Sequence, residues 1–367
     1  MIVRIFGLSA VVTVISLVVA YVYQGWTGLT LCAILGVLEV SLSFDNAVIN
    51  AGILERMSRF WQRMFLTVGV LVAVFGMRLV FPLAIVWITG GLNPVEAFRL
   101  AMHPPAGGAD YFPDGSASYE TILRAAHPQI AAFGGMFLLL LFLNFILADR
   151  SVTWLSWVER PLARLGKLDQ LSVVVAASLL VVIGEFLVPD DSRATVLIAG
   201  LLGMIVYLVV DGLSSLFHAP REHTEGPAPA TVAVGKAGFF LFVYLEILDA
   251  SFSFDGVIGA FAITPDPILI ALGLGFIGAM FVRSITIFLV RQGTLGQYRY
   301  LEHGAHWAIG ALAVILLLSV RIDINEVVTG LVGVAFIGAS LTSSVLANRR
   351  DRRAGERGSI ASLDSRS

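Results

Sequence analysis

The octapeptide Glu39-Val-Ser-Leu-Ser-Phe-Asp45-Asn46 recurs 210 residues further along the chain as Asp249-Ala-Ser-Phe-Ser-Phe-Asp255-Gly256. The two copies share both serines, the Phe before the final Asp, and that Asp, and each copy begins with an acidic residue. Both lie inside long apolar runs, where a carboxylate is costly and is usually kept for function. A duplicated acidic motif at membrane depth is typical of transporters built from two repeats. The motif therefore predicts a membrane protein that moves cations.

The composition excludes a soluble globular protein. Hydrophobic residues make up 57% of the 367 residues and charged residues only 14%, with a mean hydropathy of +0.87. An average soluble domain carries about 25% charged residues. The single cysteine, Cys32, excludes an intramolecular disulfide and a thiolate cluster. The first apolar stretch has no convincing signal-peptide cleavage site, so we interpret it as a membrane span.

Ten apolar segments are long enough, or nearly so, to cross a hydrocarbon core about 30 Å thick. We expect an all-α polytopic membrane protein with ten spans, at about 3–23, 28–53, 65–90, 129–148, 171–188, 194–217, 236–263, 267–290, 301–320 and 324–347.

The distribution of basic residues tests this count. With ten spans, 18 Lys and Arg residues fall on the side of the N-terminus and 4 on the other side. The positive-inside rule then predicts cytoplasmic N- and C-termini in a bacterial plasma membrane. The motif segments are the second and seventh spans, five apart, so they cross in opposite directions. The expected architecture is an inverted five-plus-five repeat.

The predicted organisation has three parts. The first transmembrane half is 1–190, with its motif helix at 28–53 and an external loop at 91–128; the second half is 191–347, with a cytoplasmic linker at 218–235 and its motif helix at 236–263; a disordered basic cytoplasmic tail occupies 348–367.

Four carboxylates are the predicted metal ligands. Glu39 and Asp249 fall near the middle of their spans, and Asp45 and Asp255 lie six residues further along each helix, or about 9 Å at 1.5 Å per residue. Inversion places Asp45 toward the cytoplasm and Asp255 toward the outside. We therefore expect a ladder of carboxylates across the membrane.

Other polar residues of the motifs are expected to support these ligands. Asn46 and Gly256 tolerate left-handed backbone, which predicts helix breaks with exposed carbonyl ligands. Glu246 lies one turn before Asp249 on the same face. Hydroxyl oxygens are supplied by Ser41, Ser43, Ser251 and Ser253. The alternative for these serines is a hydrogen bond to the preceding turn or close helix packing.

Arg78 and Arg283, both well inside apolar segments, are expected to face the carboxylates. A purely structural pairing is the alternative role for the acidic residues. Four carboxylates against two guanidinium groups leave two negative charges if all are ionised, which a divalent cation or two protons would balance. Oxygen ligands without sulfur favour Mn²⁺, Mg²⁺ or Ca²⁺ over Cu⁺ or Zn²⁺. There is no Walker motif, so ATP is not expected to drive the chain directly.

At these motifs the sequence resembles the TerC family, named for tellurium resistance, and in particular a TerC-related membrane family of undetermined function. The resemblance rests on both octapeptides, on the arginine in the helix after each, and on Arg299-Tyr-Leu-Glu-His303. It implies membership of a wider exporter superfamily with links to manganese efflux. It also implies metal coordination by Glu39, Asp45, Asp249 and Asp255. Gly256 departs from the expected Asp-Asn or Asp-Ser pattern.

The sequence therefore predicts an exporter of a divalent metal, Mn²⁺ first, rather than an enzyme. We expect the lipid bilayer and the metal ion as partners, no nucleic acid and no permanently bound cofactor; the sequence assigns no oligomeric state. Two alternatives remain open: a non-transporting membrane scaffold of a stress or metal-resistance complex, and an intramembrane aspartyl hydrolase. The hydrolase requires two carboxylates within reach of one water, whereas inversion separates Asp45 from Asp255.

Overall fold

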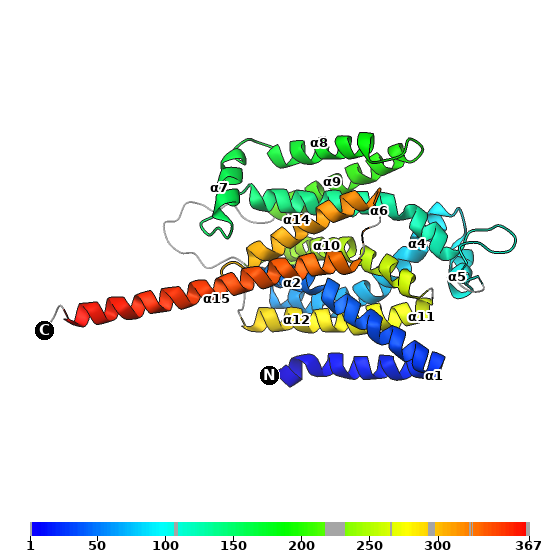
Figure 1. Ribbon diagram of the computed structural model, residues 1–367, viewed down its shortest axis with the longest axis horizontal. Helices are drawn as coiled ribbons and strands as arrows, with labels where there is room; N and C mark the ends of the chain where they lie inside the picture. Colours follow the sequence, from blue (N-terminus) through cyan, green and yellow to red (C-terminus); the bar gives the residue numbers. More distant parts are fainter. Residues whose placement is uncertain are drawn as a thin grey trace.

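The computed structural model describes residues 2–105, 109–216, 232–264, 266–292, 298–322, 324 and 326–364. Throughout these residues the secondary structure is helical, with no strand, and the prediction of an all-α protein is confirmed. The helices form one elongated bundle, from which the last helix projects (Figure 1).

Seven helical segments within the described residues are long and apolar enough to span a membrane. Large hydrophobic side chains are exposed on the outer helices, as at Val22 (79% exposed) and Phe186 (80% exposed). Exposed apolar surface on this scale indicates lipid contact. The protein is therefore of the multi-pass membrane class. The seven segments are Ile5–Val40, Arg59–Thr89, Tyr119–Ile146, Arg193–Gly212, Pro267–Val290, Leu301–Ser319 and Val328–Asp351.

The first helix, α1 (Ile2–Leu42), is folded back on itself. Its backbone leaves the helical region at Gln24 (φ −134°) and Gly25 (φ 63°, ψ −145°). Glycine accommodates this positive φ without a Cβ clash. Figure 1 shows the two arms running in opposite directions along the bundle. The arms correspond to the predicted first span and to most of the second, which continues into α2 (Phe44–Leu54).

The third and eighth predicted spans share an unusual feature, a stretch of π-helix. The third comprises α3 (Arg59–Met64), η1 (Phe65–Gly69), η2 (Val72–Val80) and α4 (Phe81–Thr89). The eighth comprises α11 (Pro267–Ile270), η4 (Ala271–Gly278) and α12 (Ala279–Gln292). π-Helix is rare and is found frequently at functional sites.

The fourth span begins earlier than predicted. After the short helix α5 (Pro94–Met102), helix α6 runs over Tyr119–Ile146, ten residues before the expected start at 129. Ser118 caps it by accepting a hydrogen bond from the Thr121 N–H at 3.1 Å. Pro128 lies inside the helix instead of marking its beginning. The segment 91–128, predicted as an external loop, is thus about half helical, over 94–102 and 119–128.

Six helices remain among the described residues, and all but the first of them overlap a predicted segment. They are α7 (Ser156–Leu165), α8 (Leu171–Phe186), α9 (Arg193–Leu216), α10 (Gly235–Ile263), α14 (Leu301–Ser319) and α15 (Glu326–Asp364). Most of the linker predicted at 218–235 lies outside the described residues. α15 continues to Asp364, so the segment predicted as a disordered tail is helical up to that residue. Its Arg, Ala and Glu residues favour helix, and it contains no proline.

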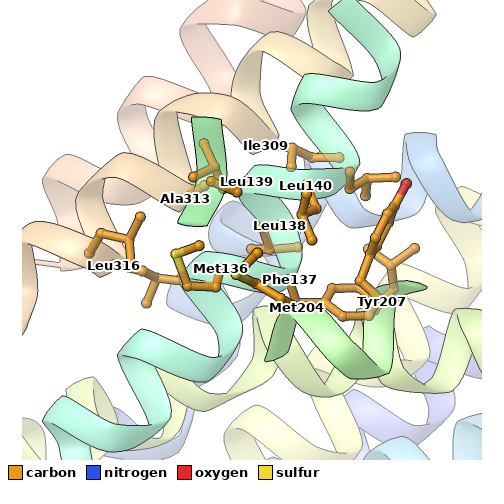
Figure 2. Close-up of a cluster of buried hydrophobic side chains, with 14 of the residues drawn as sticks. Met136, Phe137, Leu138, Leu139, Leu140, Met204, Tyr207, Ile309, Ala313 and Leu316 are labelled. Carbon is orange, nitrogen blue, oxygen red and sulfur yellow. The ribbon is translucent and has the colours of Figure 1, made fainter. Parts of the chain in front are cut away.

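The core of the bundle surrounds α6. Its middle turns are buried against α9 and α14, with Met136, Phe137, Leu138 and Leu140 fully enclosed. Figure 2 shows these side chains interleaved with Met204, Tyr207, Ile309, Ala313 and Leu316 from the two neighbouring helices. The packing fixes α6 as the central support of the bundle.

The two motif helices run antiparallel. Gln24, before the second arm of α1, donates a hydrogen bond from Nε2 to Asp266 Oδ2, after α10, at 2.6 Å. At the other end, the Ser58 N–H after α2 donates to the Ala233 carbonyl before α10 at 3.0 Å. The start of each motif helix therefore lies beside the end of the other.

Candidate ion-binding site

A small cavity lies where the two motif helices meet the π-helical spans. Its volume is about 30 Å³, and a buried water needs about 10–15 Å³, so it has room for one or two water molecules or one bare cation. α2, η1, α10 and α12 all contribute to the wall. The polar lining consists of Ser43, Asn50, Asp249, Arg283 and Thr286.

Glu39 reaches this cavity through Ser43. The Ser43 hydroxyl donates a hydrogen bond to Glu39 Oε1 at 2.6 Å, and both residues are buried. The carboxylate is seated on Gly278 of η4, where an added Cβ would lie 2.6 Å from Glu39 Cβ and overlap Cγ. The position of the Glu39 side chain, in the first half, therefore requires the absence of a side chain at Gly278, in the second half.

In the second motif helix, α10, a carboxylate of the second half packs on a glycine of the first half. Asp249 lines the cavity directly, and Glu246 lies one turn before it on α10. Glu246 Oε1 is seated on Gly69 of η1, and an added Cβ at Gly69 would overlap it. Each motif helix thus places a carboxylate on a glycine of the π-helical span from the other half.

Two oxygens near the cavity have no hydrogen-bond partner in the described part of the chain: Asn50 Oδ1 and Glu246 Oε1 are buried and unsatisfied. Leaving a buried acceptor unpaired costs roughly 1–3 kcal/mol. Unsatisfied oxygens beside a cavity of this size are suitable ligands for a hard cation.

Arg283 lines the cavity from α12. Its Nε donates to the Leu66 carbonyl of η1 at 2.7 Å, which joins the two π-helical spans. Glu39, Glu246 and Asp249 against this guanidinium leave two negative charges in the neighbourhood if all are ionised. In that ionisation state a dication would neutralise the site.

Six of the predicted residues have side chains outside the described part: Ser41, Asp45, Arg78, Ser251, Ser253 and Asp255. Among the described side chains, no three His, Cys, Asp or Glu residues are grouped closely enough to hold a metal ion. The structure does bring four of the predicted residues together at the cavity: Glu39, Ser43, Asp249 and Arg283. Glu246 lies beside them, and Asn46 is buried on α2.

The predicted helix breaks are partly corrected. The interruption in the first motif helix is at Ser43, two residues before Asp45, where α1 ends and α2 begins. The break predicted at Gly256 is wrong, because α10 continues without interruption to Ile263. A glycine permits a break but does not enforce one when the i to i−4 hydrogen bonds remain available.

A much larger cavity, of about 800 Å³, lies on the other side of α2. We call it the vestibule. α2 lines it with Val48, Ile49, Gly52 and Ile53, whereas Ser43 and Asn50, two turns apart, line the small cavity. At 100° per residue these sets lie on different faces of the helix. α2 is therefore the wall between the vestibule and the small cavity.

Charged groups surround the mouth of the vestibule. Glu302 lies 3.6 Å from Arg56 and 3.8 Å from Arg150, and all three are partly exposed. Partial burial raises the pKa of the Glu55 carboxyl; the Arg56 charge lowers it, and the Glu302 charge raises it further. Burial likewise lowers the pKa of the Arg150 guanidinium. These groups give the mouth a mixed charge.

Two other polar residues, Asn144 and His306, line the vestibule. The Asn144 amide donates to the Tyr207 hydroxyl at 2.9 Å and so bridges α6 and α9. His306 stacks on Phe145 with ring centroids 3.5 Å apart, and its Nδ1 lies 2.8 Å from the Glu302 carbonyl. Both residues have packing roles in the bundle.

Sequence reasoning missed Asn50, Thr286 and the two glycines. Asn50 follows Ser43 by seven residues, so helical periodicity alone would have placed it on the same face. Gly278 ends the run Gly273-Leu-Gly275-Phe-Ile-Gly278, and small residues in membrane helices signal close approach. The partner that approaches could not be identified from spacing.

A protein family model matches residues 44–351, most of the chain. The chain belongs to this family. Its description is "Protein of unknown function (DUF475)". The region matched to the DUF475 family includes Asp45, Asp249 and Asp255 but begins after Glu39. Nothing in that description links DUF475 to TerC. Comparison with curated proteins and with solved structures finds no match.

Proposed function

We propose that this protein is a membrane transporter that exports a divalent metal cation through the carboxylate site between its motif helices. Mn²⁺ is the favoured ion. The observation that carries the proposal is the small cavity lined by Ser43, Asn50 and Asp249, with Glu39 and Glu246 next to it. A polar cavity of one-ion size, with acidic side chains around it in an apolar bundle, is suited to a dehydrated cation.

The proposed ligands are all oxygen donors. Asp249 and Asn50 face the cavity, and Glu39 reaches it after release from Ser43. Asp45 and Asp255 are proposed to complete the path on either side. Mn²⁺, Mg²⁺ and Ca²⁺ all accept such ligands, and Mn²⁺ is favoured by the proposed relationship to TerC. The cation is cargo and not a resident cofactor.

The proposed architecture is ten spans in an inverted five-plus-five repeat. The antiparallel motif helices support it, as do π-helical segments in both the third and eighth spans. The contacts are reciprocal: α1 packs on η4, and α10 packs on η2. We place both termini in the cytoplasm of a bacterial cell, on the basis of the arginine distribution.

In this arrangement the structure corresponds to an inward-open state. The vestibule opens at the end of the bundle that carries Arg56, Arg150 and Arg299, which is the proposed cytoplasmic end. A cation would enter there and pass α2 to reach the site. Movement of one half against the other would then open the opposite path.

The test uses cells that lack the gene, complemented with wild-type protein or with Asp45→Asn, Asp255→Asn or Ser43→Ala. Total cellular manganese is measured after a manganese load and normalised to the amount of protein in the membrane. We expect both Asn variants to accumulate manganese as the deletion strain does, because the amide removes the charge that compensates the cation. Ser43→Ala should have a smaller effect.

The same experiment separates the alternatives. A scaffold would retain its cellular role in both Asn variants, with unchanged manganese content. If Asp45→Asn restores wild-type manganese levels, the carboxylates are structural and the transporter proposal fails.

A further inference from the structure

Another polar cavity, of about 350 Å³, lies apart from the ion site, between the end of α6, α7 and the start of α14. We call it the basic pocket. Four cationic side chains line it: Arg150, Arg160, Arg164 and Lys167. Against Asp149 and Glu159, they leave an excess of two positive charges. The lining therefore favours an anion.

Three of these cations have no partner in the described part of the chain. Arg160, Arg164 and Lys167 form no hydrogen bond or ion pair there, and all are exposed. Arg150, by contrast, lies over the Phe145 ring, with its guanidinium carbon 3.8 Å from the ring centroid. Like charges gathered on a short segment repel one another unless an anion joins them.

Glu159 forms no ion pair with Arg160, Arg164 or Lys167 in the described part of the chain, because its carboxylate is directed to other groups. It is 4% exposed and accepts hydrogen bonds from the Trp154 N–H at 3.0 Å, the Leu155 N–H at 3.2 Å and the Trp307 Nε1–H at 3.1 Å. His303 Nδ1 lies 3.2 Å away. These contacts fix α7 to α14, so the pocket is held in shape without a ligand.

α7 is also suited to a membrane surface. It lies across the end of the bundle, roughly perpendicular to α6 and α8 (Figure 1). Trp157 is 78% exposed, and the apolar Leu165 and Leu168 are exposed as well. Exposed Trp and Leu beside Arg and Lys is the pattern of a helix at the level of lipid headgroups.

We propose that the basic pocket binds the phosphate of an anionic phospholipid headgroup. Arginine forks recognise phosphate oxygens bidentately, and lysine adds a point charge. Basic pockets between membrane helices bind anionic headgroups in this way. Leu165 and Leu168, next to the cations, would contact the acyl chains. This inference is independent of the proposed metal transport.

The test is native mass spectrometry of the purified full chain, titrated with phosphatidylglycerol or with phosphatidylcholine. Wild type should retain phosphatidylglycerol preferentially. The triple variant Arg160→Gln, Arg164→Gln, Lys167→Gln should bind it roughly ten- to a hundredfold more weakly, since each basic residue near a lipid surface contributes about a factor of five.

Two matched variants guard against a loss of fold or a general charge effect. Arg59→Gln, Arg349→Gln, Arg350→Gln removes three exposed charges elsewhere and should bind lipid as wild type does. Arg160→Lys, Arg164→Lys keeps the charge and should retain most of the binding. Equal loss in both triple variants, or no preference for phosphatidylglycerol in wild type, would overturn the proposal.

Inorganic phosphate distinguishes a lipid from a free anion. Phosphate at millimolar concentration should compete weakly with the lipid, because it lacks acyl contacts. The lipid assignment is wrong if phosphate raises the thermal unfolding temperature of wild type but not of the pocket variant, while phosphatidylglycerol leaves the unfolding temperature of wild type unchanged. The ligand would then be a free anion.

Discussion

At the scale of single residues, two glycines determine where two of the buried carboxylates can lie. Glu39 rests on Gly278 and Glu246 on Gly69, each across the boundary between the halves. A larger residue at either glycine would push the carboxylate from its position. These contacts connect the acidic motif to the helix that supports it, so both can be tested by adding a single methyl group.

Gly278→Ala should destabilise the protein by about 1–3 kcal/mol, as overpacking typically does. The added Cβ meets Cβ and Cγ of Glu39, and rotation of the side chain cannot relieve the contact with Cβ, because Cβ is fixed by the backbone. Thermal unfolding in detergent measures the effect. Gly338→Ala is the control, because a Cβ there has no neighbour within 4 Å. An unchanged unfolding temperature in Gly278→Ala would mean that Glu39 is not held as described.

Glu246→Gln should weaken Mn²⁺ binding on the order of tenfold or more, since a unit charge near a cation contributes several kcal/mol even at an effective dielectric constant of about 20. Gln keeps the shape but removes the charge. Calorimetric titration of Mn²⁺ into the purified protein measures the change. Glu120→Gln is the control, because that carboxylate pairs with Arg124 at 2.5 Å, away from the site. Equal affinities in the two variants would remove Glu246 from the site.

The charged residues of the site could be predicted from the sequence, because a charge in an apolar run is conspicuous. Glu39, Asp249 and Arg283 were found in this way, and the structure brings them to one place. Asn50 and Thr286 were not found, since neutral polar residues are common in membrane helices. Periodicity places Asn50 on the face of Ser43, but the helix that brings Thr286 to that face could not be identified from spacing.

At the scale of elements, α2 is the component that separates the vestibule from the ion site. It is a short helix, set off from α1 by the interruption at Ser43. Its two faces line different cavities. Residues on opposite faces of this one short helix therefore differ in which cavity they reach.

Cysteine labelling tests the two faces of α2. In a Cys32→Ala background, Ile53→Cys should react readily with a water-soluble maleimide, because it lines the vestibule. Asn50→Cys should react at least about tenfold more slowly, because Asn50 is 2% exposed and small-cavity residues are reached only when local structure opens. Comparable rates would show that α2 does not divide the two cavities.

The element boundaries show what sequence patterns can and cannot define. Hydropathy located the long helical segments but not α5 or α7, and Pro128 was taken as a boundary although α6 passes through it. Gly256 was expected to break α10 and does not. The π-helical segments were not anticipated, because π-helix is rare and the hydropathy pattern does not distinguish it from α-helix.

At the scale of the whole molecule, the motif helices cross in opposite directions between two π-helical spans. The vestibule lies at the arginine-rich end of the bundle, and α6 forms the core behind it. This arrangement places the acidic residues between the halves, where relative movement would change access to them. The central claim is therefore that Asp249 and its neighbours carry a divalent cation across the membrane.

Mn²⁺ flux into proteoliposomes that contain a Mn²⁺-quenched dye tests this claim most directly. Wild-type protein should quench the dye, Asp249→Asn should reduce the rate to that of empty liposomes, and Glu120→Gln should match wild type. Each variant is checked for equal incorporation and for its elution volume in detergent. If wild type gives no flux above empty liposomes, or if Asp249→Asn transports Mn²⁺ at the wild-type rate, the account is contradicted.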